Sequence, residues 1–186
     1  MIFNQSNATC YIFTFKDGLL SLLAHDLKLK VLRFKINIED SPKASSPWLQ
    51  ANATFDATSI QTVCAIKGGI EDLKILSKQN CIDINKNIAN DILRSKKFLA
   101  IQFKSNSISG LADNFVIIGQ LTICNVTRQI KVPLKQFKGQ YQAKITLNQT
   151  DFNIKPFSAL MGAMTIKPEI MIRIAMLPSS TKVPAN

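Results

Sequence analysis

Alternation of apolar and polar residues runs through most of the chain and predicts β-strands. In the segment 27–39 (LKLKVLRFKINIE), apolar residues take every second position up to Val31 and again from Phe34 onward. Successive side chains of a strand point to opposite faces, so this segment has one apolar and one polar face. The pattern changes register between Val31 and Leu32, which predicts a β-bulge that bends the strand.

The same period recurs elsewhere and predicts seven further strands. They cover residues 8–16, 48–59, 99–103, 115–123, 130–137, 141–147 and 169–176. Pro168 stands at the start of the last strand, where a missing N–H is tolerated. The connections carry turn residues: Gly18, a loop at 41–47 (SPKASSP), and the Lys138–Gly139 pair. Asn125 is expected in the left-handed conformation of a tight turn.

One segment has helical spacing instead. Ile84, Ile88 and Ile92 recur at intervals of four, and Asp83 is placed to cap the start of a helix. Gly68–Gly69, before this helix, lacks the Lys-Ser/Thr that a phosphate-binding loop needs, so we predict a turn there.

These elements define the predicted fold. Short strands with short connections and one helix indicate an all-β protein, an eight-stranded antiparallel up-and-down barrel with one flanking helix. Eight strands close into a barrel that holds either a packed core or one elongated ligand. Residues 1–177 are predicted to form this barrel, and residues 178–186 a flexible C-terminal tail.

Composition adds a strong positive charge. The formal net charge is +11, while hydrophobic residues make up 46% of the chain and charged residues 19%. Such a charge attracts nucleic acid, an anionic membrane or the phosphate of an amphiphile. The lysines are dispersed and the few arginines form no cluster, so the sequence does not favour nucleic-acid binding. It leaves peripheral membrane contact open.

Catalytic and metal-binding patterns are missing from the sequence. His25 is the single histidine, and the four cysteines show no zinc-like spacing, so we expect reduced structural thiols, no metal, no cofactor and no enzyme activity. No apolar run reaches the roughly 20 residues that span a bilayer. The N-terminus lacks the pattern of a signal peptide, which predicts a cytoplasmic protein, or a periplasmic one if the chain is a processed form.

Three stretches resemble the YceI-like family. They are GLLSLLAHDLKLKV (18–31), GQLTICNVTRQIKVPL (119–134) and TDFNIKPFSALMGAMTIKPEIMIRI (150–174). The resemblance extends over residues 8–177 and also includes NIANDILRSKKFLAIQFKS (87–105). Asn125 and Asn153 replace two glycines of the family pattern; since Asn accepts a positive φ, we expect both turns to survive.

The resemblance implies a bacterial lipocalin-like barrel with a long apolar tunnel for a polyisoprenoid or similar amphiphilic lipid. We therefore expect binding, transport or sequestration of such a lipid, a quinone or a prenyl phosphate. The alternative is a basic barrel with a packed core that binds nucleic acid or an anionic membrane through its surface. The sequence does not say whether two barrels pair into a homodimer.

Candidate ligand-binding residues follow from these hypotheses. His25 is either a structural residue or a contact for the ligand's headgroup, and Lys28 and Lys155 could meet a diphosphate. Aromatic and methionine side chains either pack the core or line a pocket that adapts to a flexible chain. The apolar candidates are Phe34, Phe55, Phe103, Phe115, Phe152, Ile154, Phe157, Leu160, Met161 and Met164.

Overall fold

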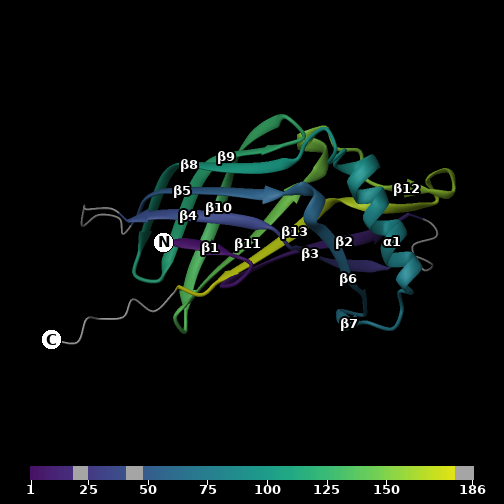
Figure 1. Cartoon of the computed structure of the whole chain (residues 1–186), viewed down its shortest axis with the longest axis horizontal. Helices are drawn as coiled ribbons and strands as arrows, with labels where there is room; N and C mark the ends of the chain where they lie inside the picture. The colour runs from purple at the N-terminus through teal and green to yellow at the C-terminus, as the bar shows by residue number, and fades with distance from the viewer. Residues whose placement is uncertain (19–24, 41–47, 179–186) are drawn as a thin grey trace.

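The protein is an antiparallel β-sheet that curls around an apolar interior, with α1 lying across one end (Figure 1). This description comes from a computed structural model and covers residues 1–18, 25–40 and 48–178. The strands are β1 (Ile2–Asn4), β2 (Ala8–Asp17), β3 (Asp26–Val31), β4 (Phe34–Asp40), β5 (Trp48–Asp56), β6 (Ile60–Lys67), β7 (Ile70–Asp72), β8 (Ala100–Leu111), β9 (Asn114–Ile123), β10 (Val126–Phe137), β11 (Gln140–Asn148), β12 (Ser158–Ala159) and β13 (Met164–Met176). The helical segments are η2 (Ala57–Ser59), α1 (Lys78–Asn87), η3 (Ile88–Ile92), η4 (Gln149–Phe152) and η5 (Leu160–Gly162).

The all-β class with one α-helix is confirmed, but the count of eight strands is wrong. Within the described residues the sheet has thirteen strands, in the order β1-β4-β5-β8-β9-β10-β11-β13-β2-β3-β6-β7, with β12 paired to β13. The strand predicted over 27–39 is divided into β3 and β4, the strand predicted over 48–59 ends at Asp56, and β6 was not predicted. The three short strands β1, β7 and β12 are too short to show a period. From β8 to β11, each strand lies beside the next one in the chain, as the up-and-down prediction requires.

The expected β-bulge after Val31 is instead a break between two strands. β3 pairs with β2 and β6, whereas β4 pairs with β1 and β5. Across the break the N–H of Leu32 donates to the carbonyl of Ser59, and the N–H of Asp56 donates to the carbonyl of Arg33. The break is therefore held by hydrogen bonds to the end of β5 and to η2, and the sheet curls at this point.

The predicted helix exists but starts earlier than its isoleucines suggest. α1 begins at Lys78, after the N-cap Ser77, whose hydroxyl oxygen accepts the Asn80 N–H in a capping box. Asp83 lies inside α1 and is not its cap. The isoleucine spacing continues through η3, a π-helical turn of Ile88–Ile92. Their periodicity marks the face of the helix turned to the barrel and not its ends.

Both asparagines at the family's glycine positions adopt a positive φ, as expected: 64° at Asn125 and 56° at Asn153. Lys138 and Gly139 also have positive φ, which confirms the turn between β10 and β11. The last strand starts earlier than predicted, at Met164. Pro168 stands within it where pairing with β2 is interrupted between Ile166 and Ile170, so no ladder hydrogen bond is lost there.

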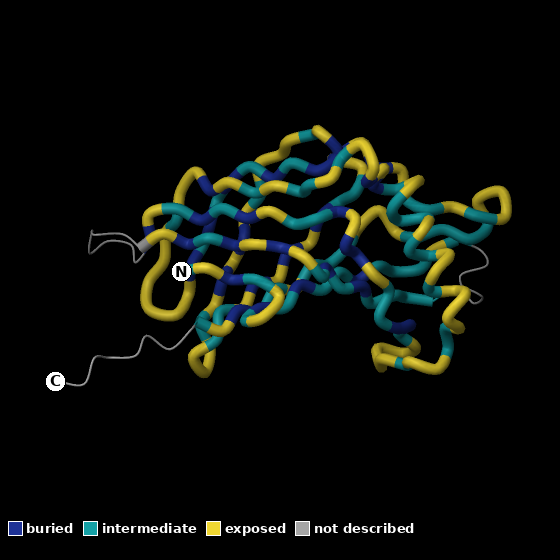
Figure 2. Tube along the Cα trace, viewed as in Figure 1, coloured by how far each residue is buried: buried dark blue, intermediate teal, exposed yellow. Residues whose placement is uncertain are grey.

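Buried and exposed residues alternate along the strands, and the exposed ones gather in turns at both ends (Figure 2). In β9 the pattern is regular from Phe115 to Ile123, with every second residue buried. All four cysteines are free, and Cys81 is the only one not fully buried. No described helix has the length and apolarity needed to cross a bilayer. The predicted loop 41–47, the tail from 179 and residues 19–24 of the first family motif lie outside the described residues.

Candidate functional site

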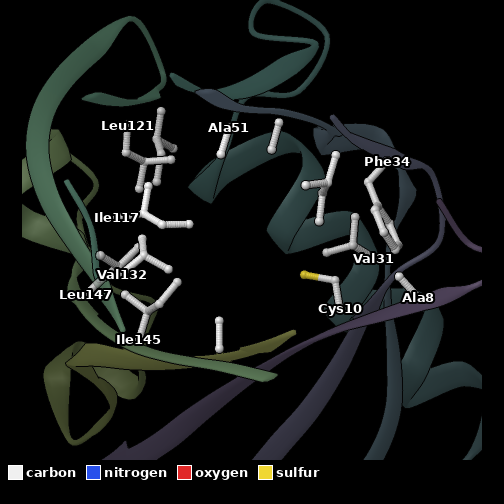
Figure 3. Packing of buried hydrophobic residues seen from close by; sticks show 14 of the residues in the cluster. Ala8, Cys10, Val31, Phe34, Ala51, Ile117, Leu121, Val132, Ile145 and Leu147 are labelled. Carbon is white, nitrogen blue, oxygen red and sulfur yellow. The ribbon is translucent and has the colours of Figure 1, made fainter. Parts of the chain in front are cut away.

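The inward side chains of the barrel leave a cavity of about 500 Å³ between them. It is lined from nearly every side of the sheet, for example by Ile12, Leu29, Ile117, Ile145 and Ile172, together with isoleucines of α1 and η3. Figure 3 shows Ile117 and Cys10 pointing toward each other across the interior from opposite walls. This volume lies within the roughly 300–1,000 Å³ of small-molecule sites.

Three aromatic rings pack together beside one end of the cavity, next to the lining residues Leu134 and Met176. Trp48 at the start of β5 lies 4.5 Å from the ring of Phe115 and 5.1 Å from that of Tyr141, measured between centroids. Trp48 and Phe115 are buried, with exposed fractions of 3% and 6%. Edge-on and tilted contacts of this kind are favourable between aromatic rings. We call this end the deep end.

The other end, toward α1, carries most of the polar side chains that line the cavity. They come from β2, the residue just before β3, α1, η4 and the start of β13. They are Thr14, His25, Asn80, Asp83, Asn87, Gln149 and Thr165. We call this end the polar end. Apart from these residues and Asn52 on β5, the described lining is apolar or cysteine.

α1 is held across the polar end by one of its own asparagines. The side-chain oxygen of Asn85 accepts hydrogen bonds of 2.8 Å from both the backbone N–H and the hydroxyl of Thr62 on β6. This contact turns Ile84 and Ile88 toward the cavity. The helix therefore forms part of the wall and brings Asn80, Asp83 and Asn87 to the polar end.

Thr14 places a hydroxyl in the wall at the polar end. Its Oγ1 is buried and, within the described part of the chain, has no hydrogen-bond partner. A buried polar atom without a partner costs stability, commonly about 1–3 kcal/mol. In a cavity wall, such an atom is also available to a polar group of a bound ligand.

The lining carries little charge. None of the described residues around the cavity is a lysine or an arginine, and Asp83 is the one carboxylate among them. Burial raises the pKa of the Cys10 thiol to about 12, so this cysteine is neutral at physiological pH. Lys28, expected near a diphosphate, instead pairs with Glu71 at 2.6 Å, and neither it nor the exposed Lys155 lines the cavity. No described group of His, Cys, Asp or Glu could hold a metal ion.

Seven of the predicted ligand-binding residues line the cavity. They are His25, Phe55, Phe103, Phe152, Ile154, Phe157 and Met164. Phe103 owes its place to Gly119, where a Cβ would lie 2.6 Å from the Phe103 ring. At the same point β8 carries one extra residue between Ser105 and Ser107. Whether these seven residues contact a ligand stays a prediction.

Four other predicted residues lie outside the lining. Phe115 is in the aromatic group of the deep end, and Phe34 is buried against Phe55, with 5.8 Å between ring centroids. Leu160 and Met161 are 60% and 100% exposed, because they form the tip of the connection from β12 to β13. Apolar composition alone did not distinguish this tip from a lining segment.

The main lining residues were not among the predicted ones. These are the isoleucines and other aliphatic side chains on the inward faces of the strands, which the alternation itself marks. The amides of α1 and the Thr14 hydroxyl were also not predicted as lining groups. Their position depends on how α1 packs, which no local pattern reveals.

This architecture is similar to that of a known protein family and of several solved structures. The family described as "YceI-like domain" matches residues 13–176. No curated protein sequence matches the chain.

Three solved structures share the fold. Burkholderia cenocepacia BcnA is 15% identical, with a TM-score of 0.65 and coverage of 92% of this chain and 96% of that one. A polyisoprenoid-binding domain from Saccharophagus degradans is 9% identical, with a TM-score of 0.54 and coverage of 95% and 97%. The Campylobacter jejuni YCEI protein is 13% identical, with a TM-score of 0.53 and coverage of 82% and 86%. At these identities the likeness concerns the fold.

Proposed function

The chain belongs to the YceI-like family, and on that premise we propose that it is a non-enzymatic protein that carries or sequesters a long apolar lipid inside the barrel. The observation that supports this most is the cavity, which is apolar along its walls and polar at the α1 end. An amphiphile with an apolar tail and a polar headgroup matches this division. The cavity does not fit the alternative of a fully packed core.

Burial of the tail supplies the affinity. Each methylene removed from water contributes about 0.8 kcal/mol. Isoleucine, leucine and phenylalanine side chains surround the cavity, so a tail finds few polar groups to desolvate. Part of this gain offsets the freedom that a flexible chain loses on binding. A polyisoprenoid suits this site in our proposal, and the Saccharophagus degradans domain of similar fold is described as binding a polyisoprenoid.

The polar end favours an uncharged headgroup. Hydroxyl and amide groups of Thr14, Asn80 and Gln149 donate or accept hydrogen bonds, whereas a phosphate calls for lysine or arginine. The carboxylate of Asp83 also repels an anion. Of the two expected ligands, we therefore propose the quinone rather than the prenyl phosphate.

Native mass spectrometry of the delipidated protein tests this function. The protein is mixed with a prenyl quinone, a prenyl alcohol and a prenyl phosphate that share one tail length. We expect one-to-one complexes with the quinone and the alcohol, and weaker binding of the phosphate. Absence of binding to all three contradicts the lipid-binding proposal, and tightest binding of the phosphate contradicts the headgroup assignment alone.

A further inference from the structure

The outer face of five neighbouring strands carries a concentration of positive charge. Strands β10, β11, β13, β2 and β3 lie side by side in that order. Since their alternate residues line the cavity, the residues between point outward. Outward cations in the middle of these strands include Lys30, Lys131, Lys135, Lys144 and Arg173, and we call these five residues the basic wall.

The strand register aligns three of these cations in one row. Lys144 on β11 lies directly opposite Arg173 on β13, Arg173 lies opposite Tyr11 on β2, and Tyr11 lies opposite Lys30 on β3. The row crosses four strands and could not be seen from the dispersed positions in the sequence.

Acidic residues are missing from the middle of this face. The segments 9–15, 28–30, 129–135, 142–146 and 171–175 contain no Asp or Glu. Glu71 of β7 reaches the edge of the face, where it pairs with Lys28. Like charges directly opposite each other on two strands are destabilising. The Lys144–Arg173 pair is therefore a cost that an anionic partner would offset.

Two aromatic rings in the middle of this face, Tyr11 and Phe13, have cations above them. The Nζ of Lys28 lies 4.2 Å from the centroid of the Tyr11 ring, and the guanidinium carbon of Arg173 lies 4.9 Å from that of Phe13. Phe13 is buried, with 7% of its surface exposed. Proteins that bind single-stranded nucleic acid leave such rings open for stacking with bases. The middle of this face instead presents charge above its rings.

We propose that the basic wall docks the protein on an anionic lipid bilayer. Charge complementarity supports a bilayer surface, since lysine and arginine side chains near anionic headgroups add affinity that salt screens. The choice of a bilayer rests on the proposed function, because a polyisoprenoid resides in a membrane. Docking brings the cavity close to its ligand's source.

Vesicle sedimentation tests the basic wall with a matched control. The wall variant is Lys30→Gln, Lys144→Gln and Arg173→Gln; the control is Lys96→Gln, Lys97→Gln and Lys104→Gln, exposed cations outside these five strands with the same change in charge. We expect the wild type and the control to bind vesicles of phosphatidylcholine with phosphatidylglycerol at low salt, and not pure phosphatidylcholine. The wall variant should bind about 100-fold more weakly.

Several outcomes overturn the proposal. They are no binding of the wild type to anionic vesicles, equal weakening in both variants, or binding that added salt does not reduce. Tighter wall-dependent binding of a single-stranded oligonucleotide would assign the face to nucleic acid instead. The salt dependence of the wild type tests the proposal even if the wall variant fails to fold. The vesicles contain no prenyl lipid, so a negative sedimentation result contradicts the docking proposal and leaves the proposed cavity function untouched. Vesicle binding by a protein that binds no prenyl lipid contradicts only the cavity function.

Discussion

The Ser59 hydroxyl accepts the backbone N–H of Arg33 at 3.0 Å, at the break between β3 and β4. The same hydroxyl donates to the carbonyl of Asp56 at 2.8 Å, and Ser59 is only 1% exposed. One side chain thus satisfies two backbone groups that leave the sheet ladder. The curl of the sheet at the break between β3 and β4 therefore depends on Ser59, which lies far from this break in the sequence.

Substitution Ser59→Ala should lower the free energy of unfolding by about 1–3 kcal/mol, because it removes the part-buried hydrogen bonds to the Arg33 N–H and the Asp56 carbonyl. Urea unfolding followed by circular dichroism measures this change. Ser109→Ala, on the exposed face of β8, serves as control and should change stability by less than about 0.5 kcal/mol. Equal effects of the two substitutions would contradict the role given to Ser59.

The substitution Thr14→Val should have different effects on the stability of the protein and on its affinity for a quinone. Replacing an unpaired buried hydroxyl by a methyl group of similar shape should leave the ligand-free protein unchanged or stabilise it by about 1 kcal/mol. If a quinone oxygen meets this hydroxyl, the same change should weaken quinone binding about 3- to 10-fold. Thermal unfolding and titration calorimetry measure the two effects.

Thr146→Val provides the control, because Thr146 is exposed on the outer face of β11. It should alter neither stability nor quinone affinity beyond small surface effects. Unchanged quinone affinity in Thr14→Val would show that the ligand's polar group lies elsewhere.

A bulky residue in the cavity wall should shorten the space available to the apolar tail of a bound lipid. Ala143 lines the cavity on β11, and Ala143→Phe adds a ring to a site with free volume, so we expect the protein to fold with a loss below about 3 kcal/mol. Binding of long prenyl quinones should fall more than binding of short ones. Gln142→Phe, on the next residue and the opposite face, should preserve both. Native mass spectrometry across a series of tail lengths reads out the difference.

The strands were predictable where one face meets the interior and the other meets solvent. β9 shows this best, since a buried residue at every second position leaves a direct mark in the sequence. Asn125 and Asn153 were predictable for a similar reason, because their side chains tolerate the φ that each turn requires. These features depend on local geometry and therefore appear in local sequence.

The remaining features depend on contacts between distant segments. The break after Val31 is stabilised by Ser59, and α1 is positioned by the bond from Thr62 to Asn85. The exposure of Met161 follows from its place at a connection tip, although its apolar character suggested a lining residue. In the candidate site, the aromatic pattern predicted part of the lining. The polar end could not be predicted, because it depends on how α1 packs against the sheet.

The Cys10 thiol should make stability depend on alkaline pH. Its pKa is raised by burial to about 12 from an ordinary value of 9.0. The unfolded chain therefore loses this proton at lower pH than the folded protein, so the thiol's contribution is complete below pH 9 and declines as pH rises toward 12. The decline is about 1.4 kcal/mol per pH unit in that window. Cys10→Val removes the titration, so the free energy of unfolding of the wild type should fall relative to this variant above pH 9. Urea unfolding of both proteins from pH 8 to pH 10.5 measures the difference, and parallel curves would show that Cys10 is not buried in the folded wall.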